Sequence, residues 1–375
     1  MSSQLYSPRP KDLLAGHVLK SGWVMGQPLP KPLGATGSNF GTGYIAHRGS
    51  EKAFVKAIDF VHALRDAPDP LAALRSLTNE ALFERDTLKA CAEAGLGHVI
   101  RYIEYEVVPA PNGDLAEQVH CLVMEVGNGD LRATMGAQKV FGGAWALKVM
   151  AETAKGIHEL HKLGIAHQDI KPSNVISVPN NRSTSPFGYD ETLLKISDLG
   201  RVTRRGRAGP FDHELFPGDP NYMPPEHWYP NAFAPGVLQN RPWNDGREAA
   251  DAYMLGSLMI FTLTGVTLQS VVVQNLPTAF LPSVWAGRYD EDLIAVLKAA
   301  HTKAIVKCIS EVGYGELATP LKSIALEITH PDPTQRGDRK ARRAITKAVG
   351  MDRISQRLAA LYARAQAIEI GRSKR

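Results

Sequence analysis

Residues 167–174 read HQDIKPSN, directly after a segment, 144–163, whose apolar residues recur at the spacing of a buried helix. Within this octapeptide, the Asp169 carboxylate can accept a hydroxyl proton, Lys171 can neutralise an anionic group, and Asn174 can ligate a metal ion. A base, a cation and an amide at this spacing are typical of a phosphoryl-transfer loop. The structural alternative is a turn in which Asp169 and Asn174 only cap the backbone.

A second carboxylate follows in SDLG, residues 197–200, at the end of a predicted strand, Leu193–Ile196. Asp198 stands 24 residues after Asn174, and the glycine behind it provides a backbone pivot. An Asp-Leu-Gly turn is uninformative by itself. In this order after the octapeptide, it indicates a second metal-binding group.

A glycine-rich segment lies further upstream, at residues 33–44 (LGATGSNFGTGY), between two predicted strands. Glycines permit positive φ angles and let backbone amides approach a phosphate group closely. A glycine-rich hairpin without any ligand explains the same residues equally well.

Lys56 lies in an apolar strand run, 53–58 (AFVKAI), where an unpaired ammonium group is costly. The following segment, 71–93, has the apolar spacing of a helix, and its Glu84 is the predicted partner of Lys56. The alternative is an edge-strand lysine and a solvated helical glutamate.

Taken in order, these segments resemble the protein kinase superfamily over residues 20 to 337. The resemblance implies an α+β, bilobal protein-kinase-like fold, with ATP and Mg²⁺ (or Mn²⁺) bound between a β-rich N-lobe with one helix, αC, and a mainly helical C-lobe. The predicted parts are an irregular N-terminal lead-in (1–20), the N-lobe (21–126), the C-lobe (127–337) and a basic helical C-terminal tail (338–375).

The resemblance also implies residue roles. Asp169 is implied to be the catalytic aspartate, with Lys171 beside it. Lys56 is implied to hold the α- and β-phosphates, paired with Glu84 of the αC helix. The remaining implied contacts are the phosphate-covering Gly34, Gly37 and Gly41, the hinge residues Met124, Glu125 and Gly127 at adenine, and the metal ligands Asn174 and Asp198.

Two later segments add to the resemblance. Residues 218–226 (GDPNYMPPE) are similar to the end of an activation segment, and residues 332–336 (DPTQR) are similar to a late arginine motif of the family. Glu226 and Arg336 are implied to form a buried ion pair. The Lys171-Pro172 pair is the form typical of serine/threonine kinases rather than tyrosine kinases.

The nucleotide pocket departs from the family pattern at two positions. Gly43 stands where a valine normally covers adenine, and Phe54 stands where the family prefers alanine. We expect a volume swap, in which Phe54 supplies the apolar roof of the adenine pocket and Ile176 its floor.

The activation segment departs as well. Gln168 replaces the arginine that commonly holds a phosphate on this segment, and between Asp198 and Glu226 the hydroxyl-bearing residues are Thr203 and Tyr222. Activity without activation-loop phosphorylation is therefore expected.

Asp219 occupies the position of a threonine that bridges the catalytic aspartate and lysine in serine/threonine kinases. We expect this carboxylate to pair with Lys171 and to lie near Asp169, where two like charges disfavour joint ionisation.

Charge is uneven along the chain of 375 residues. Residues 338–375 hold eleven Lys/Arg against three Asp/Glu, a net +8, so that the remainder carries −3 of the total of +5. The tail is expected to pack on the C-lobe as a helix with a solvated basic face. A docking helix for a regulatory protein and a basic contact with nucleic acid are the alternatives. Its apolar residues form one helical stripe: Ile354, Leu358, Leu361, Ala365 and Ile368.

The composition, 44% hydrophobic and 22% charged, is that of a soluble globular protein. The most apolar stretch, residues 254–266, is too short and too polar to cross a bilayer, so a core helix and no membrane insertion are expected. The three cysteines have no metal-like spacing, and residues 1–10 do not resemble a secretory signal. A cytoplasmic location is therefore expected.

The sequence thus predicts an ATP-dependent serine/threonine kinase that acts on a protein substrate. Two alternatives stay open: an ATP-binding pseudokinase, scaffold or partner-activated module, which Phe54 and Asp219 leave in play, and a kinase-like enzyme that acts on a small molecule.

Overall fold

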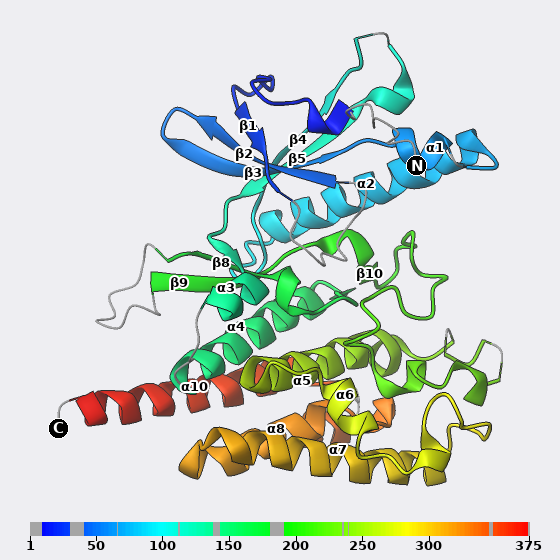
Figure 1. Ribbon diagram of the computed structural model, residues 1–375, viewed down its shortest axis with the longest axis vertical. Helices are drawn as coiled ribbons and strands as arrows, with labels where there is room; N and C mark the ends of the chain where they lie inside the picture. The colour runs from blue at the N-terminus through cyan, green and yellow to red at the C-terminus, as the bar shows by residue number, and fades with distance from the viewer. Residues whose placement is uncertain are drawn as a thin grey trace, which may run out of the picture. The chain divides into compact units, whose positions relative to one another are not determined.

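The structure is a computed structural model that describes residues 10–30, 41–65, 67–111, 113–137, 143–180, 191–234, 236–238, 240–344 and 348–373. The chain divides into two compact units, whose elements are labelled in Figure 1. The first unit holds Met1–Gly95 and Ile100–Gly127, and the second holds Leu96–Val99 and Asn128–Arg375.

The first unit is built on a five-stranded antiparallel sheet in the order β1-β2-β3-β5-β4. Two helices accompany it. The bounds are β1 Val24–Pro28, β2 Gly41–Arg48, β3 Glu51–Ile58, α1 Val61–Arg65, α2 Pro70–Glu93, β4 Tyr102–Val108 and β5 Val119–Glu125.

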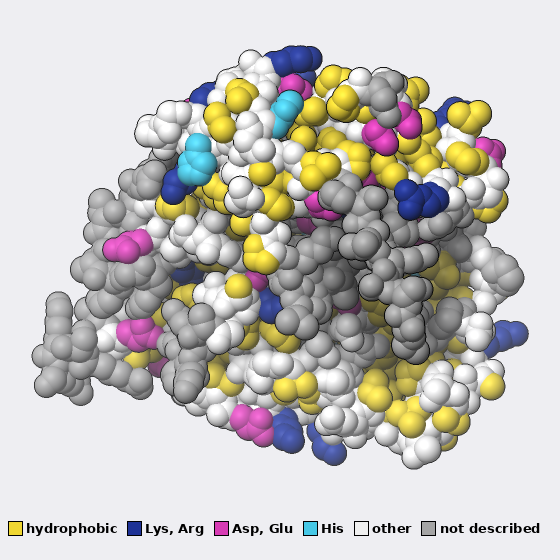
Figure 2. All heavy atoms as spheres, turned by 45° about the horizontal axis from the view of Figure 1, so that its top comes forward, with side chains coloured by type: hydrophobic (Ala, Val, Ile, Leu, Met, Phe, Trp, Pro, Cys, Tyr) yellow, Lys and Arg dark blue, Asp and Glu magenta, His cyan; other side chains and the backbone are white. Residues whose placement is uncertain are grey.

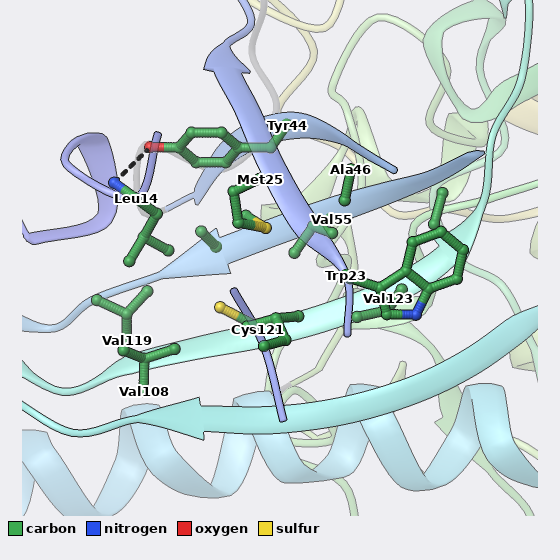
Figure 3. Packing of buried hydrophobic residues seen from close by; sticks show 13 residues of the cluster. Leu14, Trp23, Met25, Tyr44, Ala46, Val55, Val108, Val119, Cys121 and Val123 are labelled. Atoms are coloured by element: carbon green, nitrogen blue, oxygen red, sulfur yellow. Dashed lines mark hydrogen bonds between the residues drawn. The ribbon is translucent and has the colours of Figure 1, made fainter. Parts of the chain in front are cut away.

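One face of this sheet carries an apolar core (Figure 3). Side chains alternate along β3, so that Val55 is buried on this face and Lys56 points to the other. Tyr44 crosses the core, and its hydroxyl accepts a hydrogen bond from the Leu14 amide (3.4 Å) and donates one to the Lys11 carbonyl (2.6 Å). The lead-in before β1 is thereby fixed to the sheet.

Helix α2 begins at a complete N-cap. The Asp69 carboxylate accepts hydrogen bonds from two backbone amides, and Pro70 occupies the first helical position, where no amide hydrogen is needed. The predicted helix over 71–93 is confirmed within one residue. Its buried face contains Phe83, Glu84 and Leu88.

The second unit is mainly helical, with short strand pairs next to the predicted catalytic loop. The bounds are β6 Gly129–Asp130, α3 Leu131–Ala137, α4 Gly143–Lys162, β7 Ile165–Ala166, β8 Val175–Pro179, β9 Thr192–Ile196, β10 Thr203–Arg204, α5 Ala249–Thr264, α6 Leu268–Val273, α7 Glu291–Val312, α8 Ala318–Ile328, α9 Arg339–Arg343 and α10 Met351–Ser373. A π-helical turn, η8 (Asn244–Glu248), leads into α5.

Helix α5 is buried on nearly all sides, which confirms the core helix expected from the apolar stretch around residue 260. No helix in the described part of the chain combines the length and the apolar character that a bilayer crossing requires. All three cysteines are free and buried, as expected of small apolar side chains.

Helix α10 lies along α4 (Figure 1), and its stripe is buried at Ile354, Leu358, Leu361 and Ala365. The arginines beside the stripe are paired within the chain. Their ion pairs are Arg353 with Asp338 (3.5 Å), Arg357 with Glu327 (2.5 Å) and Asp338 (3.0 Å), and Arg364 with Glu316 (3.0 Å).

The basic side chains of the tail therefore contribute to intramolecular contacts. On the face drawn in Figure 2, the described Lys and Arg side chains are scattered among apolar, acidic and other groups and form no large continuous basic area. The contacts of α10 support the packed-helix alternative for the described part of the tail.

The α+β fold class is confirmed, with the sheet in one unit and most helices in the other. Strand β4 begins only at Tyr102. The preceding Val99 forms an isolated bridge with Ile196 of β9 in the second unit.

Candidate active site

The first unit holds an ion pair between β3 and α2. The Lys56 ammonium lies 2.9 Å and 3.0 Å from the two carboxylate oxygens of Glu84. Lys56 is 17% exposed and Glu84 6%. The pair is therefore largely desolvated, and each charge offsets the burial cost of the other.

Phe54 lies on the same strand as Lys56, two residues earlier. Its ring fills the space that a side chain at Gly43 would need. A Cβ atom at residue 43 would lie 2.9 Å from Phe54 Cε2 and 3.1 Å from Cζ, well inside van der Waals contact. The absent side chain at one position and the large ring at the other are therefore complementary in volume, as the volume swap requires.

Two of the predicted hinge residues, Met124 and Glu125, end β5, and Gly127 follows this strand. Met124 is buried and lies opposite Phe54 in the ladder between β3 and β5. The Glu125 amide donates a hydrogen bond to the Arg101 carbonyl (3.0 Å), so this amide already has a partner within the sheet. Of the predicted glycines, Gly41 is the first residue of β2, whereas Gly34 and Gly37 lie outside the described residues.

The octapeptide 167–174 forms a tight polar cluster in the second unit. The Lys171 ammonium lies 2.9 Å from Asp169 Oδ2, and the Asn174 side-chain amide donates to the Asp169 carbonyl (2.8 Å) and to Oδ2 (3.1 Å). All three side chains are buried. Burial raises the pKa of the Asp169 carboxyl above its ordinary value, and the Lys171 ammonium opposes part of this rise.

Helix α5 holds this loop through one carboxylate. Asp251 accepts hydrogen bonds from the amides of His167 (2.7 Å) and Gln168 (2.8 Å), and lies 2.8 Å from His161 Nε2. Gln168 has a φ of 65°, a left-handed conformation that is costly for a residue with a side chain. The hydrogen bonds from these two amides to Asp251 therefore stabilise the strained backbone conformation next to Asp169.

Asp198 follows β9 and is joined to the same loop by the backbone. The Ser197 amide donates to the Asn174 carbonyl (2.9 Å), and Asp198 itself has a left-handed φ of 61°. The negative charge of Asp198 adds to the rise in the pKa of Asp169 that burial causes.

This donor set fits a hard divalent cation. The Asn174 amide nitrogen faces Asp169. Its carbonyl oxygen accepts a long hydrogen bond from the Ser173 hydroxyl (3.5 Å), which a metal ion can replace, and Asp198 supplies carboxylate oxygens. Mg²⁺ prefers oxygen ligands and is commonly held by one or two carboxylates together with phosphates.

Asp219 adds a second carboxylate to the cluster. Its amide donates to Asp169 Oδ1 (2.8 Å), and its Oδ2 lies 3.8 Å from the Lys171 ammonium. The amide of Asn221 and its side chain both donate to Asp219 Oδ1 (3.0 and 2.9 Å). One lysine thus lies between two carboxylates.

Arg247 is a residue of this region that the sequence did not reveal. It comes from η8, and its guanidinium donates to the carbonyls of Asp212 (3.1 Å) and Glu214 (3.4 Å) in the activation segment. The Gln168 side chain donates to the Arg247 carbonyl (2.8 Å) and accepts from its guanidinium (3.3 Å). An arginine within a π-helical turn has no motif that would mark it in a sequence.

The activation segment ends at a buried ion pair. The Arg336 guanidinium binds both carboxylate oxygens of Glu226, at 2.9 Å and 2.8 Å, and both side chains are almost completely buried. The resemblance had implied this pair. Ile176 lies in β8, opposite Asp130 of β6, and is half-buried.

Comparison with known proteins identifies the family of this chain. The family model described as "Protein kinase domain" matches residues 70–277, more than half of the chain. The chain belongs to the protein kinase family. The matched region contains Glu84 and the catalytic-loop cluster, and begins after Lys56.

Curated relatives carry serine/threonine kinase names. The serine/threonine-protein kinase PkaB of Streptomyces coelicolor is 27% identical over 213 residues, which cover 54% of this chain and 45% of the relative. The probable serine/threonine-protein kinase pknA2 of Bifidobacterium longum is 30% identical over 145 residues (38% and 16%), and the serine/threonine-protein kinase PknG of Mycolicibacterium smegmatis is 27% identical over 200 residues (53% and 21%). The chain spans less than half the length of each.

The Glu226–Arg336 pair generates a stability prediction. Arg336→Met should destabilise the fold by about 3–5 kcal/mol, because it leaves the Glu226 carboxylate buried without a cation. Urea unfolding followed by circular dichroism measures the loss. Arg48→Met is the matched control, since Arg48 and its partner Glu51 are 41% and 62% exposed and such surface pairs contribute less than about 1 kcal/mol. Equal losses in the two variants would contradict the assignment.

Proposed function

We propose that this chain transfers the γ-phosphate of ATP to serine or threonine hydroxyls of a protein substrate. The observation that carries the proposal is the buried cluster of Asp169, Lys171 and Asn174, held in place by Asp251. This cluster sets a carboxylate, a cation and an amide oxygen within one loop. The Lys171-Pro172 pair and the names of the relatives support serine and threonine over tyrosine.

Each residue of the cluster has one task. The Asp169 carboxylate accepts the hydrogen bond of the attacking hydroxyl and orients its oxygen toward the phosphorus. The Lys171 ammonium, 2.9 Å from Asp169, offsets negative charge as the phosphate transfers. In the first unit, Lys56, positioned by Glu84, binds the α- and β-phosphates.

Asn174 and Asp198 would hold Mg²⁺ or Mn²⁺, and the bound cation would neutralise charge on the phosphate oxygens. The backbone link from Ser197 to Asn174 keeps these two residues in a fixed relation. The observed Asn174 orientation, with its nitrogen toward Asp169, presents the oxygen that such an ion requires.

The first test is phosphate transfer by an Asp169 variant. Asp169→Asn should lower the transfer rate by about 100-fold or more while retaining ATP binding, because the amide cannot accept the hydroxyl proton. Radiolabelled transfer to a basic protein substrate measures the rate, with exposed Asp292→Asn as the control. ATP binding without transfer in the wild type would favour the scaffold alternative.

We further propose that activity does not need phosphorylation of the activation segment. The two hydroxyl-bearing residues between Asp198 and Glu226 are Thr203 and Tyr222, which are 0% and 3% exposed. A kinase cannot reach either hydroxyl without opening the fold. Arg247, through the carbonyls of Asp212 and Glu214, supports the segment without a phosphate.

This arrangement predicts opposite outcomes for two variants. The double variant Thr203→Val/Tyr222→Phe should keep full activity, because neither hydroxyl is a phosphate acceptor. Arg247→Met should lower kcat with little change in ATP affinity, because it releases the two segment carbonyls. Steady-state kinetics measures both, and exposed Arg288→Met is the control. Loss of activity in a folded double variant would contradict the proposal.

We also propose that Phe54 supplies the apolar roof of the adenine pocket. Gly43→Val should weaken nucleotide binding, because its side chain meets the Phe54 ring, and Phe54→Ala should weaken it by removing the roof. The double variant Gly43→Val/Phe54→Ala should recover affinity, because the volume is restored. Titration with a fluorescent ATP analogue measures the three affinities. Unchanged affinity in Phe54→Ala would contradict the assignment.

A further inference from the structure

A polar cavity of about 730 Å³ lies within the second unit, away from the catalytic-loop cluster. Helices α7, α8 and α9 and the turn between α8 and α9 supply its lining. Four cationic side chains line it: Lys298 from α7, and Arg339, Arg342 and Arg343 from α9. Its volume falls in the range of small-molecule sites, which is about 300–1,000 Å³.

Two carboxylates also line the cavity, and both are already engaged. Asp245 lies 2.9 Å from the Arg342 guanidinium. Glu327 lies 2.5 Å from Arg357, which is outside the cavity, and 3.8 Å from Arg339. The acidic groups therefore do not offset all of the positive charge.

Lys298 and Arg343 form no ion pair with any residue in the described ranges, and both side chains are exposed. They come from different helices and line the same cavity. Two histidines in the lining add no charge near pH 7, because burial lowers the pKa of His301 to about 4 and also lowers that of His330. The cavity thus has a net positive lining with separated donors.

Separated guanidinium and ammonium groups suit an anion with more than one charged group. Arginine binds phosphate oxygens through two parallel hydrogen bonds, and lysine binds them as a point charge. The cavity volume far exceeds that of a single phosphate group. We propose that this cavity is a binding site for a small, multiply phosphorylated anion of the pyrophosphate class.

The cavity is joined to the activation segment by one turn of the chain. Asp245, which lines the cavity, belongs to the π-helical turn η8, which also carries Arg247 and Glu248. Arg247 donates to two carbonyls of the activation segment, and Glu248 lies 2.6 Å from Arg205. π-helical turns recur at functional sites.

An anion that binds Arg342 weakens its ion pair with Asp245, and this pair helps to stabilise the π-helical turn. This π-helical turn also positions Arg247 against the backbone of Asp212 and Glu214. Occupancy of the cavity therefore changes the order of the activation segment. This coupling does not depend on the proposed function, because segment order is measurable without any phosphate transfer.

Calorimetric titration with sodium pyrophosphate at low salt, without a divalent cation, tests the site. The full-length wild type should bind, and Lys298→Glu/Arg343→Glu should weaken binding at least about tenfold, the loss of one charge-assisted contact. Both side chains are exposed and unpaired within the described chain, so the fold should persist. Lys303→Glu/Lys307→Glu, the same charge change on α7 outside this cavity, should bind as the wild type does.

Orthophosphate, titrated in the same way, tests whether the site requires one phosphate group or two. It should bind more weakly than pyrophosphate. Absence of pyrophosphate binding, or equal weakening by the cavity pair and the control pair, overturns the site. Equal affinity for orthophosphate overturns the pyrophosphate class.

Hydrogen exchange tests the coupling. Pyrophosphate should change the exchange of the amides of residues 211–216 in the wild type and leave it unchanged in Lys298→Glu/Arg343→Glu. A wild type that binds pyrophosphate with unchanged exchange in this segment overturns the coupling.

Discussion

The Asp251 carboxylate is the group on which the catalytic loop depends. It is 0% exposed, sits in the most buried helix of the second unit, and accepts the amides of His167 and Gln168. A buried carboxylate without donors would be costly, and a left-handed Gln168 without an anchor would relax. The buried Asp251 carboxylate and the left-handed backbone of Gln168 therefore stabilise each other, and together they fix the position of Asp169.

The activation segment is held in the same manner, by contacts that need no modification. At one point the Asp219 amide binds Asp169, and at the end the Glu226 carboxylate binds Arg336. Between these two contacts, the Arg247 guanidinium donates hydrogen bonds to backbone carbonyls of the segment. In a less ordered segment, water would hydrogen-bond to these carbonyls instead. The segment thus gains its order from buried polar pairs within one unit, which are strong because they are shielded from solvent.

The sequence predicted those features that depend on local pattern. An apolar run marked β3, and apolar residues at helical spacing marked α2. The pairing of Lys56 with Glu84 also followed, because a lysine between buried strand residues requires a carboxylate within reach. In these cases, the residues adjacent in the sequence determine the secondary structure and the burial of each side chain.

Features that depend on distant partners were not predictable. Arg247 gains its role only because η8 passes beside residues 212–214, and the cavity forms from residues between 245 and 343 that no motif unites. The tail shows the same limit: its arginines indicated an exposed basic surface, but Asp338, Glu327 and Glu316 lie opposite them in the fold. Charge counted along a chain does not reveal which charges are paired.

The most direct measurement is the initial rate of γ-phosphate transfer by protein shown to be free of phosphate by mass spectrometry, followed by phosphoamino-acid analysis of the product. The account predicts immediate transfer without a lag, with label on serine or threonine. A lag that ends as the enzyme becomes phosphorylated, or label on tyrosine alone, would contradict it.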